Sequence, residues 1–345
     1  MTTSRSSRRA PQDQLEQALM EVKKVIVGQD RMVERIVVAL LARGHCLLEG
    51  VPGVAKSLAV ETLATVVGGS SVRLQFTPDL VPSDIVGTRI YRASSETFSV
   101  ELGPVFANLV LADEVNRAPA KVQSALLEVM AERQVSLGGV THKLPNPFLV
   151  LATQNPIESE GVYPLPEAQR DRFLMKVVVG HPTMNEEMEI VRRMSASRPH
   201  ATQVLSLEDL VALQTAADEV FVHHAVAEYA VRLVMATRDP EAWKVADGAR
   251  WIAHGASPRG SIGLVQAARA LALMRGRDYV MPDDIRDLAV DVLAHRIVLT
   301  YEALAEEKTG ADVVAQVLAV VTPPHVAPSQ DAGHYLPAPP QSGVA

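Results

Sequence analysis

Hydrophobic positions in the first half of the chain follow two alternating patterns. Three short apolar runs, CLLEG at 46–50, LVLAD at 109–113 and FLVLAT at 148–153, have the character of strands buried on both faces. Stretches of helical periodicity lie between them, at 31–42, 57–67 and 120–132. Strands that alternate with helices predict an α/β sandwich built on a parallel sheet.

The pattern becomes helical after about Gly180. Periodic stretches follow at 207–220, 225–237, 261–274 and 283–299, and Thr183 with Glu186 and Ser206 with Asp209 have the spacing of helix-capping pairs. We therefore predict an α/β domain at 11–180 and a smaller all-helical domain at 181–322, joined near 176–185. A basic polar tail at 1–10 and a proline-rich tail at 323–345 are expected to be disordered or flexible.

Composition narrows the class of protein. The chain has 345 residues, 48% of them hydrophobic, and a formal net charge of −7, which disfavours broad binding to nucleic acid. The single cysteine, Cys46, excludes an intrachain disulfide and has the surroundings of a buried hydrophobe. Neither a secretory leader nor an apolar stretch of roughly 20 residues is present. These features predict a cytoplasmic protein with no membrane span.

A candidate phosphate-binding loop, GVPGVAKS, connects the first predicted strand to a helix. Backbone N–H groups can curl around phosphate oxygens only where residues are small, and the following helix presents further N–H groups. Lys56 would contact the β and γ phosphates, and the Ser57 hydroxyl would bind Mg²⁺. The alternative is an ordinary strand–turn–helix connection. We expect ATP contacts from Gly50, Val51, Pro52, Gly53, Val54, Ala55, Lys56, Ser57 and Leu58.

One position of this loop departs from the usual pattern, because Ala55 replaces a glycine. Alanine would cost nothing there if the backbone φ is negative.

An acidic pair, Asp113 and Glu114, ends the second apolar run. Ligands of α/β sheets bind beyond the carboxyl ends of the strands, so Gly50 and Asp113, on strands expected to be neighbours, should meet at one crevice. Since adjacent strand residues point to opposite sides, Asp113 can hold Mg²⁺ through water while Glu114 polarises the attacking water. Alternatively, the two carboxylates cap the strand end and pair with Arg117.

Seven segments in this order resemble the AAA+ family, and within it the MoxR branch, over roughly residues 15–320. They are VIVGQD (25–30), GVPGVAKS (50–57), QFTPDLVPSDIVGTRIY (75–91), LVLADEVNRAP (109–119), LATQNP (151–156), YPLPEAQRDRF (163–173) and GASPRG (255–260).

The resemblance implies roles for further residues. Asn155 matches sensor 1, although an Asn-Pro turn is the alternative. Arg172 matches the arginine finger that reaches a neighbouring subunit, with Arg170 as a rival and a surface ion pair as the alternative. Arg259 matches sensor 2, unless it is only a helix-start arginine. The adenine-pocket segment corresponds to Val27, Gly28 and Gln29.

Two hairpins are also implied by the resemblance. The segment 77–100 is similar to the insertion that marks the branch, and 135–144 is similar to a hairpin around Gly138 and Gly139 that precedes sensor 1. Both would face the central pore of a ring, although ordinary surface hairpins are the alternative.

The function that the resemblance implies is ATP hydrolysis with Mg²⁺ in a homo-oligomeric ring, expected to be a hexamer. The ring would remodel a protein client, such as one with a von Willebrand factor A domain, or insert a cofactor or metal into it. The alternatives are a magnesium-chelatase-like subunit, a nucleic-acid motor, which the acidic charge disfavours, and a nucleotide-gated scaffold. The scattered histidines, including the adjacent pair at 223–224, predict no metal site of their own.

Overall fold

A computed structural model describes residues 10–51, 53–94, 96–155, 162–195 and 199–325. The predicted contact from Pro52 lies outside the described residues. So do the predicted tails, apart from Ala10 and residues 323–325.

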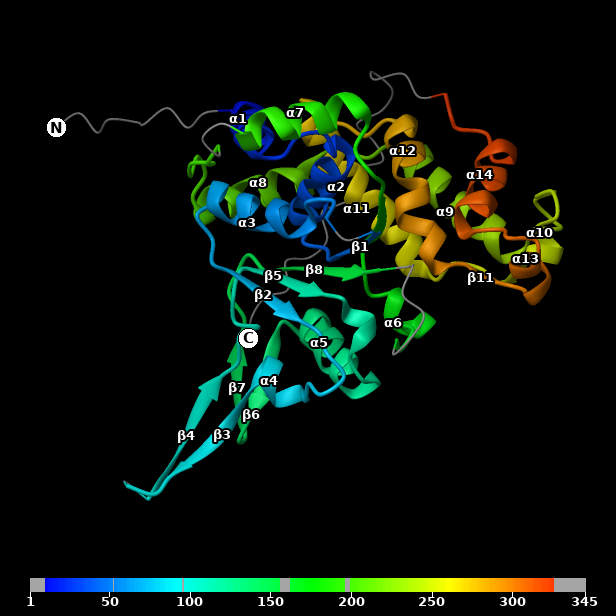
Figure 1. Cartoon of the computed structure of the whole chain (residues 1–345). Helices are drawn as coiled ribbons and strands as arrows, with labels where there is room; N and C mark the ends of the chain where they lie inside the picture. Colours follow the sequence, from blue (N-terminus) through cyan, green and yellow to red (C-terminus); the bar gives the residue numbers. More distant parts are fainter. Residues whose placement is uncertain (1–9, 52, 95, 156–161, 196–198, 326–345) are drawn as a thin grey trace.

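Five strands of the described chain form one parallel sheet in the order β2-β5-β8-β1-β9 (Figure 1). β1 (Cys46–Gly50) and β5 (Leu109–Asp113) have the predicted bounds, and β8 (Leu149–Gln154) is displaced by one residue from its prediction. The two edge strands, β2 (Ser71–Gln75) and β9 (Met175–Val179), were not predicted. The expectation that β1 and β5 are neighbours is wrong, because β8 lies between them.

Alternate residues of the central strands pack into two apolar cores on opposite faces of the sheet. In β5, Leu109 and Leu111 belong to the first core, whereas Val110 and Ala112 belong to the second. The first core includes α1 (Pro11–Val25), α2 (Asp30–Leu41) and α3 (Lys56–Val66). The second includes α4 (Pro82–Val86) and α5 (Ala120–Glu132). The predicted α/β sandwich is confirmed.

Two antiparallel hairpins extend away from the sheet (Figure 1). β3 (Gly87–Arg92) pairs with β4 (Thr97–Leu102), and β6 (Gln134–Leu137) pairs with β7 (Val140–Lys143). At the turn of the second hairpin, Gly138 and Gly139 have φ values of 59° and 83°. A tight two-residue turn of this kind needs positive φ at both positions.

The second half of the chain is mainly helical, with long helices α7 (Met184–Ser195), α8 (Leu207–Glu219), α9 (His224–Arg238), α11 (Pro258–Met274), α12 (Pro282–Leu293) and α14 (Gly310–Val320). Shorter elements are α6 (Glu167–Arg170), α10 (Gly248–Trp251), α13 (Tyr301–Ala305) and the 3₁₀ turns η1 (Val115–Arg117) and η2 (Ala294–Arg296). The side chains of both predicted capping pairs are bonded as expected.

Two predictions for this half are wrong. The stretch 283–299 is not one helix, because α12 ends at Leu293 and η2 follows. The region is not all-helical either, since β10 (Ile252–His254) pairs with β11 (Val298–Leu299). The first apolar core continues from α1 through α14, so the helical lid and the helices on that face of the sheet share one core. Within the described residues, no helix has the length and apolarity needed to cross a membrane.

Candidate active site

The loop between β1 and α3 leaves the start of a helix open. α3 begins at Lys56, and within the described residues no side chain caps its N-terminus. The first N–H groups of a helix lack partners inside the helix, so here they can bind an anion. The Lys56 amine is half-buried and donates a hydrogen bond of 2.6 Å to the carbonyl of Gly50, at the start of the same loop.

Ala55 adopts the conformation that its sequence position normally reserves for glycine. Its φ is 61° and its ψ is 21°, in the left-handed region. The condition for a cost-free alanine, a negative φ, is therefore not met: the turn into α3 imposes the glycine-like conformation, and the methyl group is accommodated at a cost.

Replacing this alanine by glycine should stabilise the protein. We expect Ala55→Gly to raise the free energy of unfolding by about 0.5–1 kcal/mol, because glycine has no Cβ and adopts the left-handed backbone conformation without strain. Urea unfolding without nucleotide measures this effect. The control Ala212→Gly, at an exposed position inside α8, should destabilise by about 1 kcal/mol. A destabilised Ala55→Gly variant would show that packing of the methyl group outweighs the strain.

Asp113, the last residue of β5, has both carboxylate oxygens engaged. The Thr153 hydroxyl on β8 donates to Oδ1 at 2.5 Å. Arg73 on β2 donates to Oδ2 through Nε at 3.0 Å and Nη2 at 2.6 Å. A guanidinium cation therefore occupies one side of the carboxylate. Carboxylate oxygens are ligands that suit Mg²⁺. The bound Arg73 guanidinium shows that the environment of Asp113 allows a cation beside this carboxylate.

The orientation of Glu114 is set by a turn of the backbone. Glu114 lies just beyond β5 with a φ of 57°, so the expected strand alternation is not the cause. Its N–H donates to the Thr153 hydroxyl at 2.8 Å. Its carboxylate accepts a 2.7 Å hydrogen bond from Gln75 and pairs with Arg117 at 3.1 Å. The ion pair with Arg117 that was considered as an alternative is therefore present. Glu114 nevertheless lies at the carboxyl end of β5, where the candidate site is.

Lys56, Asp113 and Glu114 lie within electrostatic reach of one another. Burial lowers the pKa of Lys56, and the negative charges of Asp113 and Glu114 act in the opposite direction. β8, which separates β1 from β5, contributes Asn155 directly after its last residue, and Asn155 is 7% exposed. The carboxyl ends of three neighbouring strands, β1, β8 and β5, therefore contribute to the site, whereas the sequence predicted two.

The two candidate finger arginines differ in their surroundings. Arg172 is exposed, and its Nη1 donates to the carbonyl of Leu127 on α5 at 2.8 Å. Arg170 ends α6, is half-buried, and lies near enough to His295 to help depress the pKa of that buried imidazole, an effect due mainly to burial. Only Arg172 presents its side chain outward.

Asp171, between these two arginines, is bound by the lid. The hydroxyl of Ser257 donates to its two oxygens at 3.0 and 2.9 Å. Arg296, which is buried, pairs with it at 3.1 Å, and Arg259 lies 3.6 Å away. Arg259 is the second residue of α11, and its N–H is bonded to Ser257. The sequence did not single out Ser257 or Arg296.

The segment expected to line the adenine pocket lies beside the junction of sheet and lid. Gly28 and Gln29 both have positive φ, 63° and 54°. Gln29 donates to the carbonyl of Gly180 at 2.9 Å, and a Cβ added to Gly28 would approach Glu186 Oε1 to 2.5 Å. Val27 is half-buried. This segment is thus held against the start of α7.

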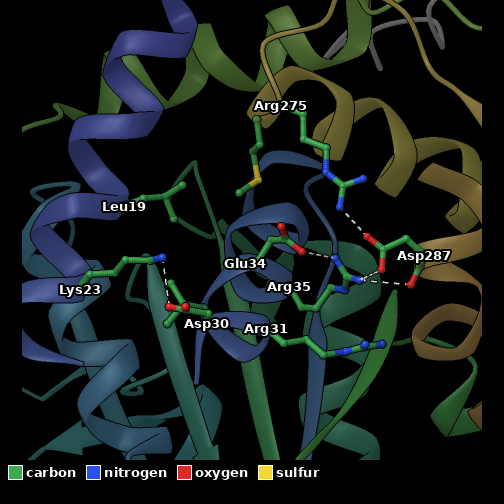
Figure 2. A pocket seen from close by; sticks show the side chains of 10 residues that line it. Leu19, Lys23, Asp30, Arg31, Glu34, Arg35, Arg275 and Asp287 are labelled. Carbon is green, nitrogen blue, oxygen red and sulfur yellow. Dashed lines mark hydrogen bonds and ion pairs between the residues drawn. The ribbon is translucent and has the colours of Figure 1, made fainter. Parts of the chain in front are cut away.

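A separate hollow of about 400 Å³ lies between α1, α2, α11 and α12 (Figure 2). Its charged side chains pair with one another: Arg35 contacts Glu34 and Asp287, and Lys23 pairs with Asp30 at 3.1 Å. None of the predicted site residues lines it. The ion pairs that line the hollow connect the surrounding helices. The hollow is not part of the candidate site at the loop 50–58.

The comparisons with known proteins agree with this fold. Residues 45–175 match the ATPase family associated with various cellular activities (AAA), and residues 249–317 match the AAA lid domain. Chaperone MoxR1 of Mycobacterium tuberculosis is 60% identical over 96% of this chain and 88% of its own. A crystal structure of a protein assigned as an ATPase from Cytophaga hutchinsonii has a TM-score of 0.85 and 46% identity, covering 90% and 95% of the two chains.

Fold and site therefore define an AAA-type ATPase domain followed by a helical lid. The chain belongs to the MoxR family of AAA+ ATPases. The magnesium-chelatase alternative has a weaker match: the 38 kDa magnesium-chelatase subunit of Acidiphilium rubrum is 30% identical over 58% of this chain and 55% of its own.

Proposed function

We propose that this protein hydrolyses ATP to ADP and phosphate with Mg²⁺, in a homo-oligomeric ring that drives chaperone-like remodelling of a protein client or insertion of a cofactor or metal into it. The observation that carries the proposal is that β1, β8 and β5 are consecutive parallel strands, so that the Lys56 loop after β1 lies at the same end of the sheet as Asp113 and Glu114. This arrangement joins a mobile cation, a metal-binding carboxylate and a second carboxylate that can accept a proton.

Each group has a role in that reaction. The loop 50–58 and the start of α3 would hold the phosphates, and Ser57 with Asp113 would hold Mg²⁺, which neutralises charge on the β and γ phosphates. Lys56 stabilises the same charge. Glu114 orients the attacking water and takes its proton, and Asn155 would bond the γ-phosphate and that water. The segment 27–29 would contact the adenine.

Two arginines would complete the site. Because Arg172 is exposed, it is the better finger for a neighbouring subunit than the half-buried Arg170. Arg259, 3.6 Å from Asp171, would report the state of the nucleotide to the lid. The proposed domains are 11–180 and 181–322, with the tails outside both, and the proposed ring is a hexamer located in the cytoplasm.

The client side of the proposal is carried by a relative and by one hairpin. A relative that is 60% identical bears the name chaperone, which favours a protein client. Four side chains of the β3–β4 hairpin are exposed although apolar: Ile90, Tyr91, Phe98 and Leu102. Exposed apolar patches mark interaction surfaces, so this hairpin would contact the client in the pore. A von Willebrand factor A domain protein is the proposed client class.

The experiment that tests the function uses Glu114→Gln. An amide of the same shape keeps nucleotide binding but cannot accept the water proton, so phosphate release should fall by about 10²- to 10⁴-fold. The variant should retain ATP on purification and hold its client for identification by mass spectrometry. The control Glu228→Gln, at an exposed position of α9, should behave as wild type. Unchanged phosphate release by Glu114→Gln would disprove the assigned role.

A further inference from the structure

The edge strand β2 holds both acidic residues of the site. Arg73 and Gln75 are two residues apart in β2 and therefore lie on the same face of the sheet. Val72 and Leu74 lie on the opposite face and pack on the second core. Gln75 is paired in register with Asp113. Arg73 binds Asp113, and Gln75 binds Glu114.

The contact between Arg73 and Asp113 is directed at one oxygen. Thr153 takes Oδ1, while Nε and Nη2 of Arg73 both donate to Oδ2. Two N–H donors fill the two lone pairs of that oxygen. The Asp113 side chain is 13% exposed, whereas the Arg73 side chain is 54% exposed. Arg73 can therefore swing into solvent, and Asp113 cannot.

We propose that Arg73 is a stand-in cation, which neutralises Asp113 in the metal-free protein and must leave Oδ2 when Mg²⁺ arrives with the nucleotide. This inference rests on the proposed role of Asp113 in binding Mg²⁺. Two cations compete for one partly buried carboxylate, and their mutual repulsion disfavours joint occupancy. The negative charge of Asp113 is therefore always neutralised by one of the two cations when the phosphates are nearby.

The exchange has opposite effects on nucleotide binding with and without metal. Without Mg²⁺, Arg73 screens the Asp113 charge, so a triphosphate binds more readily. With Mg²⁺, Arg73 has to be displaced, so binding is weaker than it would be without the arginine. Arg73 therefore reduces the dependence of nucleotide affinity on Mg²⁺, defined as the Kd in EDTA divided by the Kd at saturating Mg²⁺.

The test measures that ratio with a fluorescent, non-hydrolysable ATP analogue. Arg73→Gln should raise the ratio about tenfold, since loss of one charge-assisted contact is expected to change affinity by roughly that factor. The Kd in EDTA should increase and the Kd in Mg²⁺ should decrease. Arg73→Lys keeps the charge without the paired donors and should give an intermediate ratio. The control Arg192→Gln, on exposed α7, should leave the ratio unchanged.

A second set of variants separates this inference from the function on which it rests. Asp113→Asn alone should lower the ratio, and in its presence Arg73→Gln should have no further effect. If Asp113→Asn leaves the ratio unchanged, the metal role of Asp113 is wrong. If Asp113→Asn lowers the ratio while Arg73→Gln leaves it unchanged, or shifts both Kd values in one direction, the stand-in role is overturned and the metal site stands.

Discussion

Lys56→Ala should abolish ATP turnover. The Lys56 amine lies at the loop through its 2.6 Å bond to Gly50, and the charges of Asp113 and Glu114 reach it. Alanine lacks the positive charge that would stabilise the phosphates both in the bound triphosphate and in the transition state. Loss of one preorganised charge at the transition state costs about 10²- to 10³-fold, and weaker binding adds a similar factor, so kcat/KM should fall by roughly 10⁴-fold or more.

The measurement is steady-state phosphate release together with nucleotide affinity. Lys121→Ala, at an exposed position of α5, is the matched control and should retain wild-type rates. The fold should survive the Lys56 substitution, because the side chain is only half-buried and its bond is to its own loop. Turnover at the original rate by Lys56→Ala would refute the assigned mechanism.

Arg172→Ala should reduce kcat by about 10³- to 10⁵-fold while leaving nucleotide affinity nearly unchanged, as expected of an arginine supplied by a neighbouring subunit. In the described chain this side chain contacts the carbonyl of Leu127 and faces outward. An exposed arginine bound only to a carbonyl can move to a partner at little cost. Arg170→Ala is the comparison and should keep most of the activity.

Mixing two inactive variants tests whether the finger acts in trans. An Arg172→Ala subunit keeps an intact Lys56 loop, and a Lys56→Ala subunit keeps an intact finger. Where they alternate in a ring, some sites combine both intact parts, so phosphate release should reappear in the mixture. A mixture that stays inactive, although the two proteins co-assemble, would place the finger in its own subunit or assign it to another residue.

Strands buried on both faces could be predicted from the sequence. The apolar runs at 46–50 and 109–113 became β1 and β5 with unchanged bounds, because most residues of such a strand are apolar. β2 escaped prediction since it is an edge strand: only Val72 and Leu74 pack on a core, while its other residues are exposed or polar. Arg73 and Gln75 were missed for the same reason.

Strand order and backbone turns were harder to predict. Nothing in the local pattern indicated that β8 would lie between β1 and β5, since this order depends on how the crossovers pack in the whole sheet. The positive φ values of Ala55 and Glu114 are also set by the turns that follow each strand, and neither residue type favours them. The lid contacts of Asp171 join residues more than 80 positions apart, which local periodicity cannot reveal.

The most direct test of the central claim is a crystal structure with a non-hydrolysable ATP analogue and Mn²⁺, collected for anomalous scattering. We predict one Mn²⁺ peak bound by Ser57 Oγ and facing Asp113, with Lys56 Nζ on the β and γ phosphates and Glu114 beside the γ-phosphate. A nucleotide bound elsewhere, such as in the hollow between α1 and α12, or an ion remote from Asp113, would contradict the account.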